Sequence, residues 1–434
     1  MAVNMKNKDL LKQISPKLSE ECLQRYLRMS SGVKDINLVK YDIGGSDTAK
    51  GDSYLSIVTR LKVEGLSLSD NKTHTLSLIV KGLPANIGRR KTFRSCEFFR
   101  NEVNFYNEVL PRFLTFQEKK KLQKPFVEIP RCYEAFADGE NDFVIMEDVS
   151  HSGFVAPKRQ EGFDYEHCCA VLQIMGRFHA LSLAMKDQEP EEFKKAASSV
   201  KETYYYSENK PWYADMLRRF TDILSDAVSK ELPGTVYEEK LKMLTDDDFY
   251  DRLTNLVKPK EPYAVVGHGD TWCPNFLFRY KKYDSSDQKN EIEDVRVIDF
   301  QLARYGSPVL DLSFMIYSCT TKELLNSHYD NLLQCYYQSV CEFLTDLGSS
   351  PETIFSYKNF QSEVSAYFLF GLGMSLESVP LSLVDNSEAP DLELIKGDQA
   401  VPITDAWVVH PIKTKEGRLR LSNIFKHGVD HGFL

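Results

Sequence analysis

The chain has 434 residues, of which 42% are hydrophobic and 12% aromatic, so it can bury a large core and form two lobes. Its formal charge of −9 argues against a nucleic-acid binder, because phosphate contacts need clustered lysine and arginine. No stretch approaches the roughly 18 apolar residues of a membrane-spanning helix, and no secretory signal opens the chain. Nine cysteines without a CxxC pair favour free thiols, so we expect a cytoplasmic protein.

The first third of the chain has the pattern of an antiparallel sheet with one helix. Short apolar runs bounded by turn-forming residues predict four strands, over residues 54–63, 75–81, 131–136 and 143–146. Helical periodicity over residues 95–110 predicts a helix, and Pro111 is expected to end it. These elements predict an N-terminal lobe over residues 1–148.

The remainder of the chain is mainly helical. Apolar residues recur with helical spacing over residues 165–185, 212–228, 324–347 and 360–376. One predicted hairpin interrupts them, with strands at residues 276–278 and 295–300. The sequence therefore predicts an α+β fold with two lobes, in which residues 149–434 form the larger lobe.

The strongest motif is an HGD sequence that ends at Asp270 and is followed by Asn275 and, after a polar stretch, by Asp299. This spacing of aspartate and asparagine matches phosphotransferase loops, in which the aspartate takes the acceptor's proton and the asparagine holds magnesium. A hairpin brings its outer ends together, so Asn275 and Asp299 can reach one ion. Oxygen ligands suit Mg²⁺, and Asp299 at the end of an apolar strand needs a cation. We predict Asp270 as the base, with Asn275 and Asp299 as metal ligands.

Lys81 ends a strongly apolar strand, and Glu102 lies on the following predicted helix among aromatic residues. The aromatic residues turn one helix face inward, and Glu102 is expected to point inward with them. A buried carboxylate needs a cation, because an unpaired buried charge is costly. We predict an ion pair in which Glu102 orients Lys81 towards nucleotide phosphates. The alternative is a solvent-facing Glu102 beside a surface lysine.

Two further segments are candidates for nucleotide contacts. Backbone amides of a glycine-containing loop ahead of the first strand can cover phosphates, and we assign Gly44, Gly45 and Gly51 to it. Their spacing is not GxGxxG, and an ordinary hairpin turn explains them equally well. At the crossing between lobes, the backbone of Glu147, Asp148 and Val149 is expected to hydrogen-bond the adenine, with the side chains incidental.

Three other polar residues lie in apolar surroundings. His268 either ligates a metal or supports the catalytic loop through its ring nitrogens, and the second interpretation leaves Asp270 free as the base. Asp311, flanked by leucines, is predicted to be a buried acceptor for the amides of that loop. His179 lies on a helix beside Phe178 and is interpreted as a satisfied core residue.

With these residues the chain resembles the ecdysteroid-kinase-like family, also called CHK-like, within the wider aminoglycoside phosphotransferase and choline kinase group. The resemblance rests on Lys81, Glu102 with Phe105-Tyr106, Met146-Glu147-Asp148, HGDTWCPN, IDFQ, and Gly306 to Asp311. It implies a bilobal protein-kinase-like fold, ATP as phosphate donor and a small-molecule hydroxyl as acceptor. The chain lacks the HRD and DFG motifs of protein kinases, which argues against a protein substrate.

The expected activity is therefore ATP- and Mg²⁺-dependent phosphorylation of a small-molecule alcohol. By resemblance the acceptor is a lipophilic alcohol such as an ecdysteroid, with choline-like amino alcohols as the alternative. The aromatic residues 204–206 and 212–213, and the stretch 367–376, either line the acceptor pocket or pack helices together. A metallohydrolase using His268, a catalytically silent ligand-binding protein and a protein kinase are the remaining alternatives.

Overall fold

The computed structural model describes residues 9–44, 55–245, 248–281, 291–384, 392 and 395–434. Its N-terminal part is built on a five-stranded antiparallel sheet with strand order β1-β2-β3-β5-β4. The strands are β1 (Ile36–Ile43), β2 (Ile57–Ser67), β3 (Thr73–Gly82), β4 (Cys132–Phe136) and β5 (Phe143–Glu147). The four strands predicted from short apolar runs are confirmed, and β1 is an additional edge strand.

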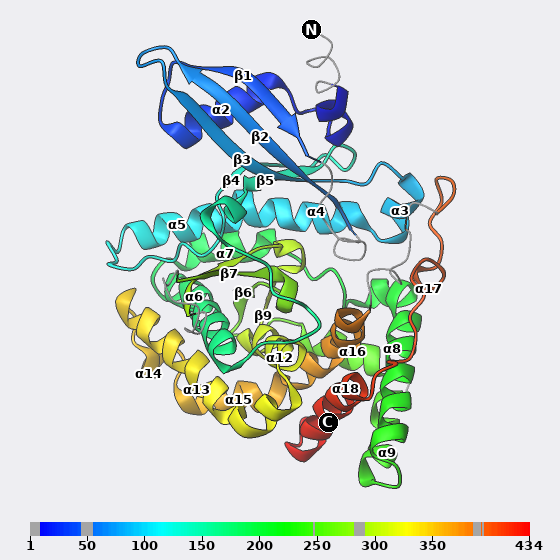
Figure 1. Cartoon of the computed structure of the whole chain (residues 1–434). Helices are drawn as coiled ribbons and strands as arrows, with labels where there is room; N and C mark the ends of the chain where they lie inside the picture. Colours follow the sequence, from blue (N-terminus) through cyan, green and yellow to red (C-terminus); the bar gives the residue numbers. More distant parts are fainter. Residues whose placement is uncertain (1–8, 45–54, 246–247, 282–290, 385–391, 393–394) are drawn as a thin grey trace.

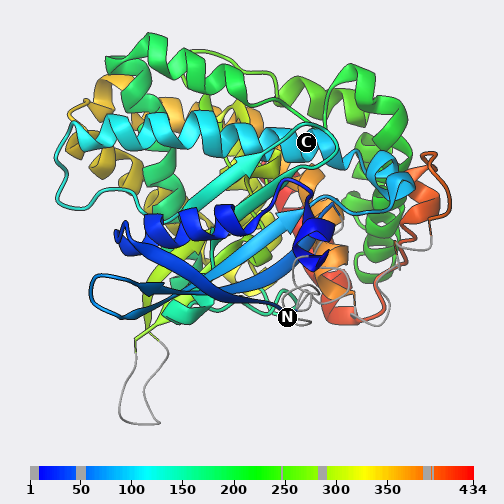
Figure 2. The same cartoon turned by 90° about the horizontal axis from the view of Figure 1, so that it is seen from above.

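One face of this sheet packs against helix α2 (Glu20–Ser31), as the two views in Figures 1 and 2 show. Ser19 caps the helix by accepting a hydrogen bond from the amide of Cys22, and Gly32 ends it in a left-handed conformation. The buried side chains of α2 join those of the strands in a separate small core, which includes Leu23, Tyr26, Val63, Leu78 and Ile145.

A nearly continuous helical rod lies between the sheet and the rest of the molecule (Figure 1). It comprises α4 (Ser95–Asn104), a π-helical turn η1 (Phe105–Val109) and α5 (Leu110–Glu118), and the short helix α3 (Ile87–Thr92) precedes it. The expectation that Pro111 ends a helix is wrong. Pro111 lies in the first turn of α5, where the π-helical turn has already broken the regular hydrogen-bond pattern.

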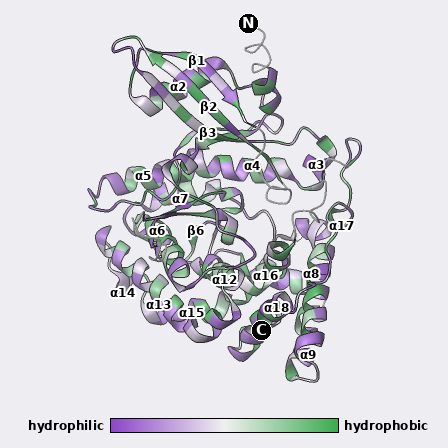
Figure 3. Ribbon diagram, in the orientation of Figure 1, coloured by the Kyte–Doolittle hydropathy of each residue, from purple (hydrophilic) through white to green (hydrophobic). Residues whose placement is uncertain are grey.

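Helices form most of the chain after β5. The longer ones are α6 (Tyr165–Gln188), α7 (Pro190–Ser199), α8 (Lys210–Glu231), α11 (Phe249–Leu256), α12 (Pro308–Cys319), α13 (Lys322–Asp346), α15 (Tyr357–Tyr367), α16 (Leu369–Leu383) and α18 (Lys415–Asp430). The shorter ones are α9 (Val236–Lys240), α10 (Lys242–Thr245), α14 (Pro351–Ile354) and α17 (Ile403–Ala406). Along α8 and α13, hydrophilic and hydrophobic residues alternate, as expected for helices with one buried face (Figure 3). The predicted helix over residues 360–376 is two helices, α15 and α16, which meet at a bend of 53°.

The predicted hairpin is confirmed as β7 (Phe276–Tyr280) paired antiparallel with β8 (Ile292–Val297). A second two-stranded sheet joins β6 (Val265–Gly267) to β9 (Arg304–Gly306). The HGD motif follows β6, and Asp299 follows β8. The two small sheets therefore bring the halves of the motif to the same place between the rod and the helices.

A large hydrophobic core joins the helical part to the rod, because Phe98, Phe105 and Phe113 belong to the same cluster as α6 and α12. The division into 1–148 and 149–434 therefore stays a prediction, although the chain does leave the large sheet at Glu147. Within the described residues, α6 is long and apolar enough to span a membrane, and the bent pair α15–α16 together would be a second such span. Most of the apolar window of α6 (78%) is buried, as in the core helix of a globular fold.

Candidate active site

The predicted ion pair between Lys81 and Glu102 is present, with Nζ of Lys81 2.7 Å from Oε2 of Glu102. Lys81 is 5% exposed and Glu102 is fully buried. Burial raises the pKa of the Glu102 carboxyl, and the charge of Lys81 opposes that rise. Oε1 of Glu102 has no hydrogen-bond partner in the described part of the chain. The carboxylate is therefore held by its lysine, which removes the solvent-facing alternative.

Asp299 is the second partner of Lys81, at 2.8 Å from Nζ. Its backbone has a φ of +70°, a left-handed conformation that is unusual for a residue other than glycine. This conformation ends β8 and starts the short turn η5 (Phe300–Leu302), in which Gln301 also faces Lys81. Burial lowers the pKa of Lys81, but the charges of Asp299 and Glu102 outweigh it and raise the pKa above its ordinary value. Lys81 is therefore a fixed cation at the meeting point of β3, α4 and the β7–β8 hairpin.

Asp311, on α12, holds the HGD loop by its backbone. Its carboxylate accepts hydrogen bonds from the amides of His268 (2.6 Å) and Gly269 (2.8 Å), as predicted. Gly269 has a φ of +84°, and a Cβ there would lie 1.8 Å from the carbonyl oxygen of Leu302. Burial alone would raise the pKa of Asp311, but hydrogen bonds from His179 and from the Gly269 amide lower it. The loop is thus anchored by a charged acceptor, and only glycine fits its turn.

Both nitrogens of His268 are used inside the loop. Nδ1 accepts the amide hydrogen of Asp270 at 3.1 Å, so Nε2 carries the proton and donates it to the carbonyl of Ile298 at 2.9 Å. Burial lowers the pKa of His268, which keeps the ring neutral in this role. The hypothesis that His268 ligates a metal is wrong for this structure, because neither nitrogen has a free lone pair. His179 is likewise a satisfied core residue, between Tyr336 and Asp311.

Asn275 contacts both halves of the motif, because its carbonyl oxygen accepts from the amide of Ile298 and its side chain contacts Asp270. Its amide nitrogen donates to the backbone oxygen of Asp270 (2.8 Å) and to Oδ2 of the same residue (2.9 Å). The pKa of the Asp270 carboxyl is raised, first by burial and then by the nearby charge of Asp299, and the Asn275 hydrogen bond partly offsets this. Asp270 therefore lies in an enclosed position beside a second acid, and Asn275 orients its carboxyl group.

Asp270, Asn275, Asp299 and Gln301 line one cavity, whose empty volume, including solvent at its mouth, is about 900 Å³. Its other walls are mainly apolar and aromatic: Phe93, Tyr204, Trp212, Trp272, Phe314, Met374, Leu381, Ile403 and Trp407. Tyr204 and Trp212, which sequence alone placed either in a pocket or between helices, therefore lie in the pocket. Tyr205 and Tyr213 are fully buried in the core.

The donor set at the polar end of this cavity fits a magnesium ion. The amide nitrogen of Asn275 is used by Asp270, so its oxygen is directed elsewhere, and Asp299 uses only Oδ1 for Lys81. Asp270 and Asp299 are two acids that line the same end of the cavity, and a cation there offsets their like charges. Mg²⁺ in nucleotide sites takes only one or two protein oxygens and completes its shell with phosphates and water. Asn275 and Asp299 satisfy that requirement.

The crossing between sheet and helices only partly fits the predicted adenine contacts. The amide of Glu147 donates to the carbonyl of Arg131, and that of Asp148 donates to Ser77. Among described residues no partner is found for the Val149 amide, so this donor is the one that remains for a base. The Asp148 side chain is not incidental, because it pairs with Arg60 at 2.6 Å and caps the turn η2 (Val149–Ser152).

The predicted glycine loop is only partly described. The amide of Gly44 donates to the carbonyl of Arg60 at 2.9 Å, which extends the pairing of β1 with β2. This amide is therefore occupied, and assigning Gly44 to phosphate binding through its N–H is wrong. Gly45 and Gly51 lie outside the described residues.

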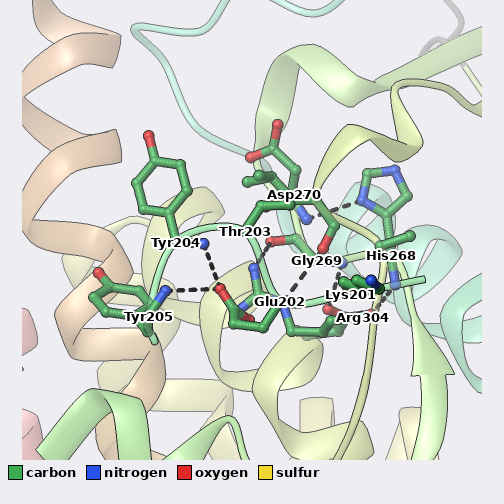
Figure 4. A network of polar contacts seen from close by, with 12 residues as sticks. Lys201, Glu202, Thr203, Tyr204, Tyr205, His268, Gly269, Asp270 and Arg304 are labelled. Atoms are coloured by element: carbon green, nitrogen blue, oxygen red, sulfur yellow. Dashed lines mark hydrogen bonds and ion pairs between the residues drawn. The ribbon is translucent and has the colours of Figure 1, made fainter. Parts of the chain in front are cut away.

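A buried network that sequence analysis did not find joins the catalytic loop to the aromatic wall (Figure 4). Arg304 donates to the carbonyl of Gly269 at 3.2 Å and pairs with Glu202 at 3.2 Å. Glu202 in turn accepts the amides of Tyr204 and Tyr205, at 2.7 and 2.8 Å. The segment that presents Tyr204 to the cavity is thus tied to the loop that presents Asp270.

Glu377 is the other site residue that the sequence analysis missed, by one position beyond the stretch 367–376. It lies on α16, faces the cavity and accepts hydrogen bonds from Tyr213 and, at 3.3 Å, from Tyr204. Burial raises its pKa to about 7, and the two hydroxyl groups offset part of that rise. The available signal was an acidic residue inside an apolar helical run, the same signal that identified Glu102.

The sequence profile of the ecdysteroid kinase-like family matches residues 50–349, more than half of the chain. The chain therefore belongs to the ecdysteroid kinase-like family, and the predicted α+β, two-lobed, kinase-like fold is confirmed. No curated protein matches it in sequence.

Among solved structures, a choline kinase from Cryptosporidium parvum Iowa II is similar, with a TM-score of 0.40 and 12% identity over 99% of this chain and 98% of that one. The GDP complex of aminoglycoside 2'-phosphotransferase-IIIa has a TM-score of 0.34 and 14% identity, covering 82% and 89%. A microcompartment-associated aminopropanol kinase has a TM-score of 0.35 and 11% identity, covering 94% and 98%.

Proposed function

We propose that this member of the ecdysteroid kinase-like family is an ATP- and Mg²⁺-dependent kinase that phosphorylates a hydroxyl of a small lipophilic alcohol, such as an ecdysteroid. One observation carries the proposal. A single cavity has Asp270, Asn275 and Asp299 at its polar end, beside the Lys81–Glu102 pair, and aromatic and aliphatic side chains over the rest of its wall.

Each polar residue has a role in this reaction that follows from its contacts. Lys81, fixed by Glu102, binds phosphate oxygens of the nucleotide. Asn275 and Asp299 hold the magnesium ion, which when bound neutralises charge on the phosphates. Asp270, oriented by its hydrogen bond from Asn275, accepts the proton of the acceptor hydroxyl.

The apolar part of the cavity wall favours a lipophilic acceptor. Phe93, Phe314, Leu381 and Ile403 offer apolar surface, and tryptophan rings lie on the same cavity. A choline-like amino alcohol is the second candidate, because the cavity also contains Glu377, an acid beside aromatic rings that can stabilise an ammonium group.

Two of the alternatives are disfavoured by geometry. A metallohydrolase centred on His268 would need a ring nitrogen that is already used by Asp270 or Ile298. In addition, no group of three or more potential His, Cys, Asp or Glu metal ligands occurs in the described part of the chain. A protein kinase would need an open surface for a peptide, whereas Asp270 is 9% exposed and lies in the wall of a cavity.

A screen of acceptors tests the proposal and also the catalytically silent alternative. The full chain is incubated with ATP and Mg²⁺ and with steroid alcohols or amino alcohols, and phosphorylated products are sought by mass spectrometry. The Asp270→Asn protein serves as the blank. We expect a phosphorylated alcohol only with the wild-type protein and only with Mg²⁺. Nucleotide binding without any phosphorylated product across the screen would support a silent binding protein instead.

A further inference from the structure

Helix α16 forms one wall of the cavity. Its residues Met374, Glu377, Ser378 and Leu381 all line the cavity, and their spacing places them on one face of the helix. The helix cannot shift easily, because a Cβ at Gly371 would lie 2.3 Å from the backbone of Ser313 on α12. Since α12 also carries Asp311, the position of this face is fixed relative to the catalytic loop.

Glu377 differs from the other enclosed glutamates of the described chain. Glu102 is paired with Lys81, Glu128 with Arg177, and Glu202 with Arg304. For Glu377 no lysine, arginine or histidine lies within ion-pair distance among the described residues, and only the hydroxyl groups of Tyr204 and Tyr213 donate to it. An enclosed acid without a cation is costly unless a ligand supplies a donor.

Ser378, the next residue, provides a second and independent observation. It is 5% exposed and lines the cavity, yet its Oγ has no hydrogen-bond partner within the described structure. Buried hydroxyl groups are nearly always hydrogen-bonded, so an unpaired one in a residue that lines the cavity beside Glu377 indicates a partner that a ligand can supply. Glu377 and Ser378 together form a polar patch in an otherwise apolar part of the wall.

The geometry points to Glu377 and Ser378 as a subsite that recognises a second polar group of the acceptor. This group is a hydrogen-bond donor, either a hydroxyl or an ammonium, and an apolar body separates it from the hydroxyl that faces Asp270. The inference rests on the proposed function, because it assumes that the acceptor occupies this cavity. It makes Glu377 a specificity-determining residue, and Tyr204 and Tyr213 hold its carboxylate in place.

The three tryptophans of the chain provide a binding signal that does not depend on turnover. Trp212, Trp272 and Trp407 all line this cavity, and the chain has no other tryptophan. Intrinsic fluorescence of the full-length protein therefore reports on ligands in the cavity. Suitable probes are 1-alkanols, α,ω-diols and ω-amino-alkanols of matched and graded chain length, which differ only in the group at the far end.

With the wild-type protein, diols and amino-alkanols of the best length should bind about tenfold more tightly than the matching 1-alkanols. Glu377→Gln keeps an acceptor oxygen but no charge, so it should abolish the preference for amino-alkanols and retain most of that for diols. Ser378→Ala should weaken both preferences by about threefold. Glu363→Gln, which changes a half-buried acid outside the cavity that accepts from Ser307, is the matched control.

Equal binding of all three classes to the wild-type protein would overturn the inference. So would a Glu377→Gln protein, folded by circular dichroism, that weakens the alkanols as much as the amino-alkanols. The same probes are then tested for phosphorylation. If the binding preferences are as expected but no probe is phosphorylated, the subsite is supported and the proposed kinase activity is not.

Discussion

Two enclosed glutamates lie at this cavity, Glu102 behind Lys81 at its polar end and Glu377 in the α16 wall at its second end, and their charges are met in different ways. Glu102 is paired with Lys81, which also holds Asp299. Among the described residues, Glu377 receives hydrogen bonds from only two tyrosine hydroxyl groups, and its pKa is raised to about 7. The comparison teaches that the first acid is completed by the protein, whereas the second is left for a ligand to complete.

Removing Lys81, the cation paired with Glu102, should have the largest effect on stability and activity. Lys81→Met leaves Glu102 buried without a partner, which should lower the free energy of unfolding by about 3–5 kcal/mol and abolish phosphate transfer. Urea unfolding measures the stability. In the double variant Lys81→Met/Glu102→Gln, most of the stability should return but the activity should not. A single Lys81→Met protein as stable as wild type would show that Glu102 does not depend on its lysine.

A change to the HGD loop should lower the rate of phosphate transfer and leave ligand binding to the cavity intact. Asp311→Asn replaces a charged acceptor of the His268 and Gly269 amides, which should cost about 1.5–3 kcal/mol of transition-state stabilisation. We expect a lower kcat with little change in ATP affinity, measured by steady-state kinetics and calorimetry. An equal loss of nucleotide affinity would contradict the assignment of Asp311 to the loop alone.

The pH dependence of stability should distinguish Glu377, which has no paired cation among the described residues, from the paired Glu102. A pKa raised from 4.5 to about 7 means that Glu377 adds stability fully below about pH 4.5 and loses it as the pH rises through 7. Relative to Glu377→Gln, the wild-type protein should therefore lose roughly 2 kcal/mol between about pH 5 and about pH 8. Urea unfolding of both proteins at each pH measures this, and other titrating groups cancel in the difference. A difference that stays constant with pH would mean that Glu377 has the same pKa in the folded and the unfolded protein.

Much of the polar end could be predicted from the sequence, because local pattern and elementary electrostatics were sufficient there. Glu102 lies among inward-facing aromatic residues, so its need for a cation followed from helix geometry. Lys81, at the end of an apolar strand, was the predicted partner. The hairpin that joins Asn275 to Asp299 followed from two apolar runs around a polar turn. Asp311 was identified by its apolar neighbours alone.

The features that sequence analysis missed depend on contacts between distant segments. Arg304 reads as an ordinary strand residue until the fold brings Glu202 and the carbonyl of Gly269 to it. Pro111 was expected to end a helix, but it lies in the first turn of α5. The expectation failed because the π-helical turn before Pro111 leaves no mark in the apolar periodicity. Glu377 carried the same signal as Glu102, but its partners Tyr204 and Tyr213 come from a segment more than a hundred residues away.

The central claim is that Asp270 acts as the base for phosphate transfer and does not serve to bind the nucleotide. Calorimetric titration of ATP and Mg²⁺ into wild-type and Asp270→Asn proteins, together with phosphorylation of the best acceptor by each, tests it most directly. The account predicts similar ATP affinity and a kcat lower by about 10²–10⁴-fold in the variant. An Asp270→Asn protein that loses ATP affinity but turns over acceptor at the wild-type rate would contradict it.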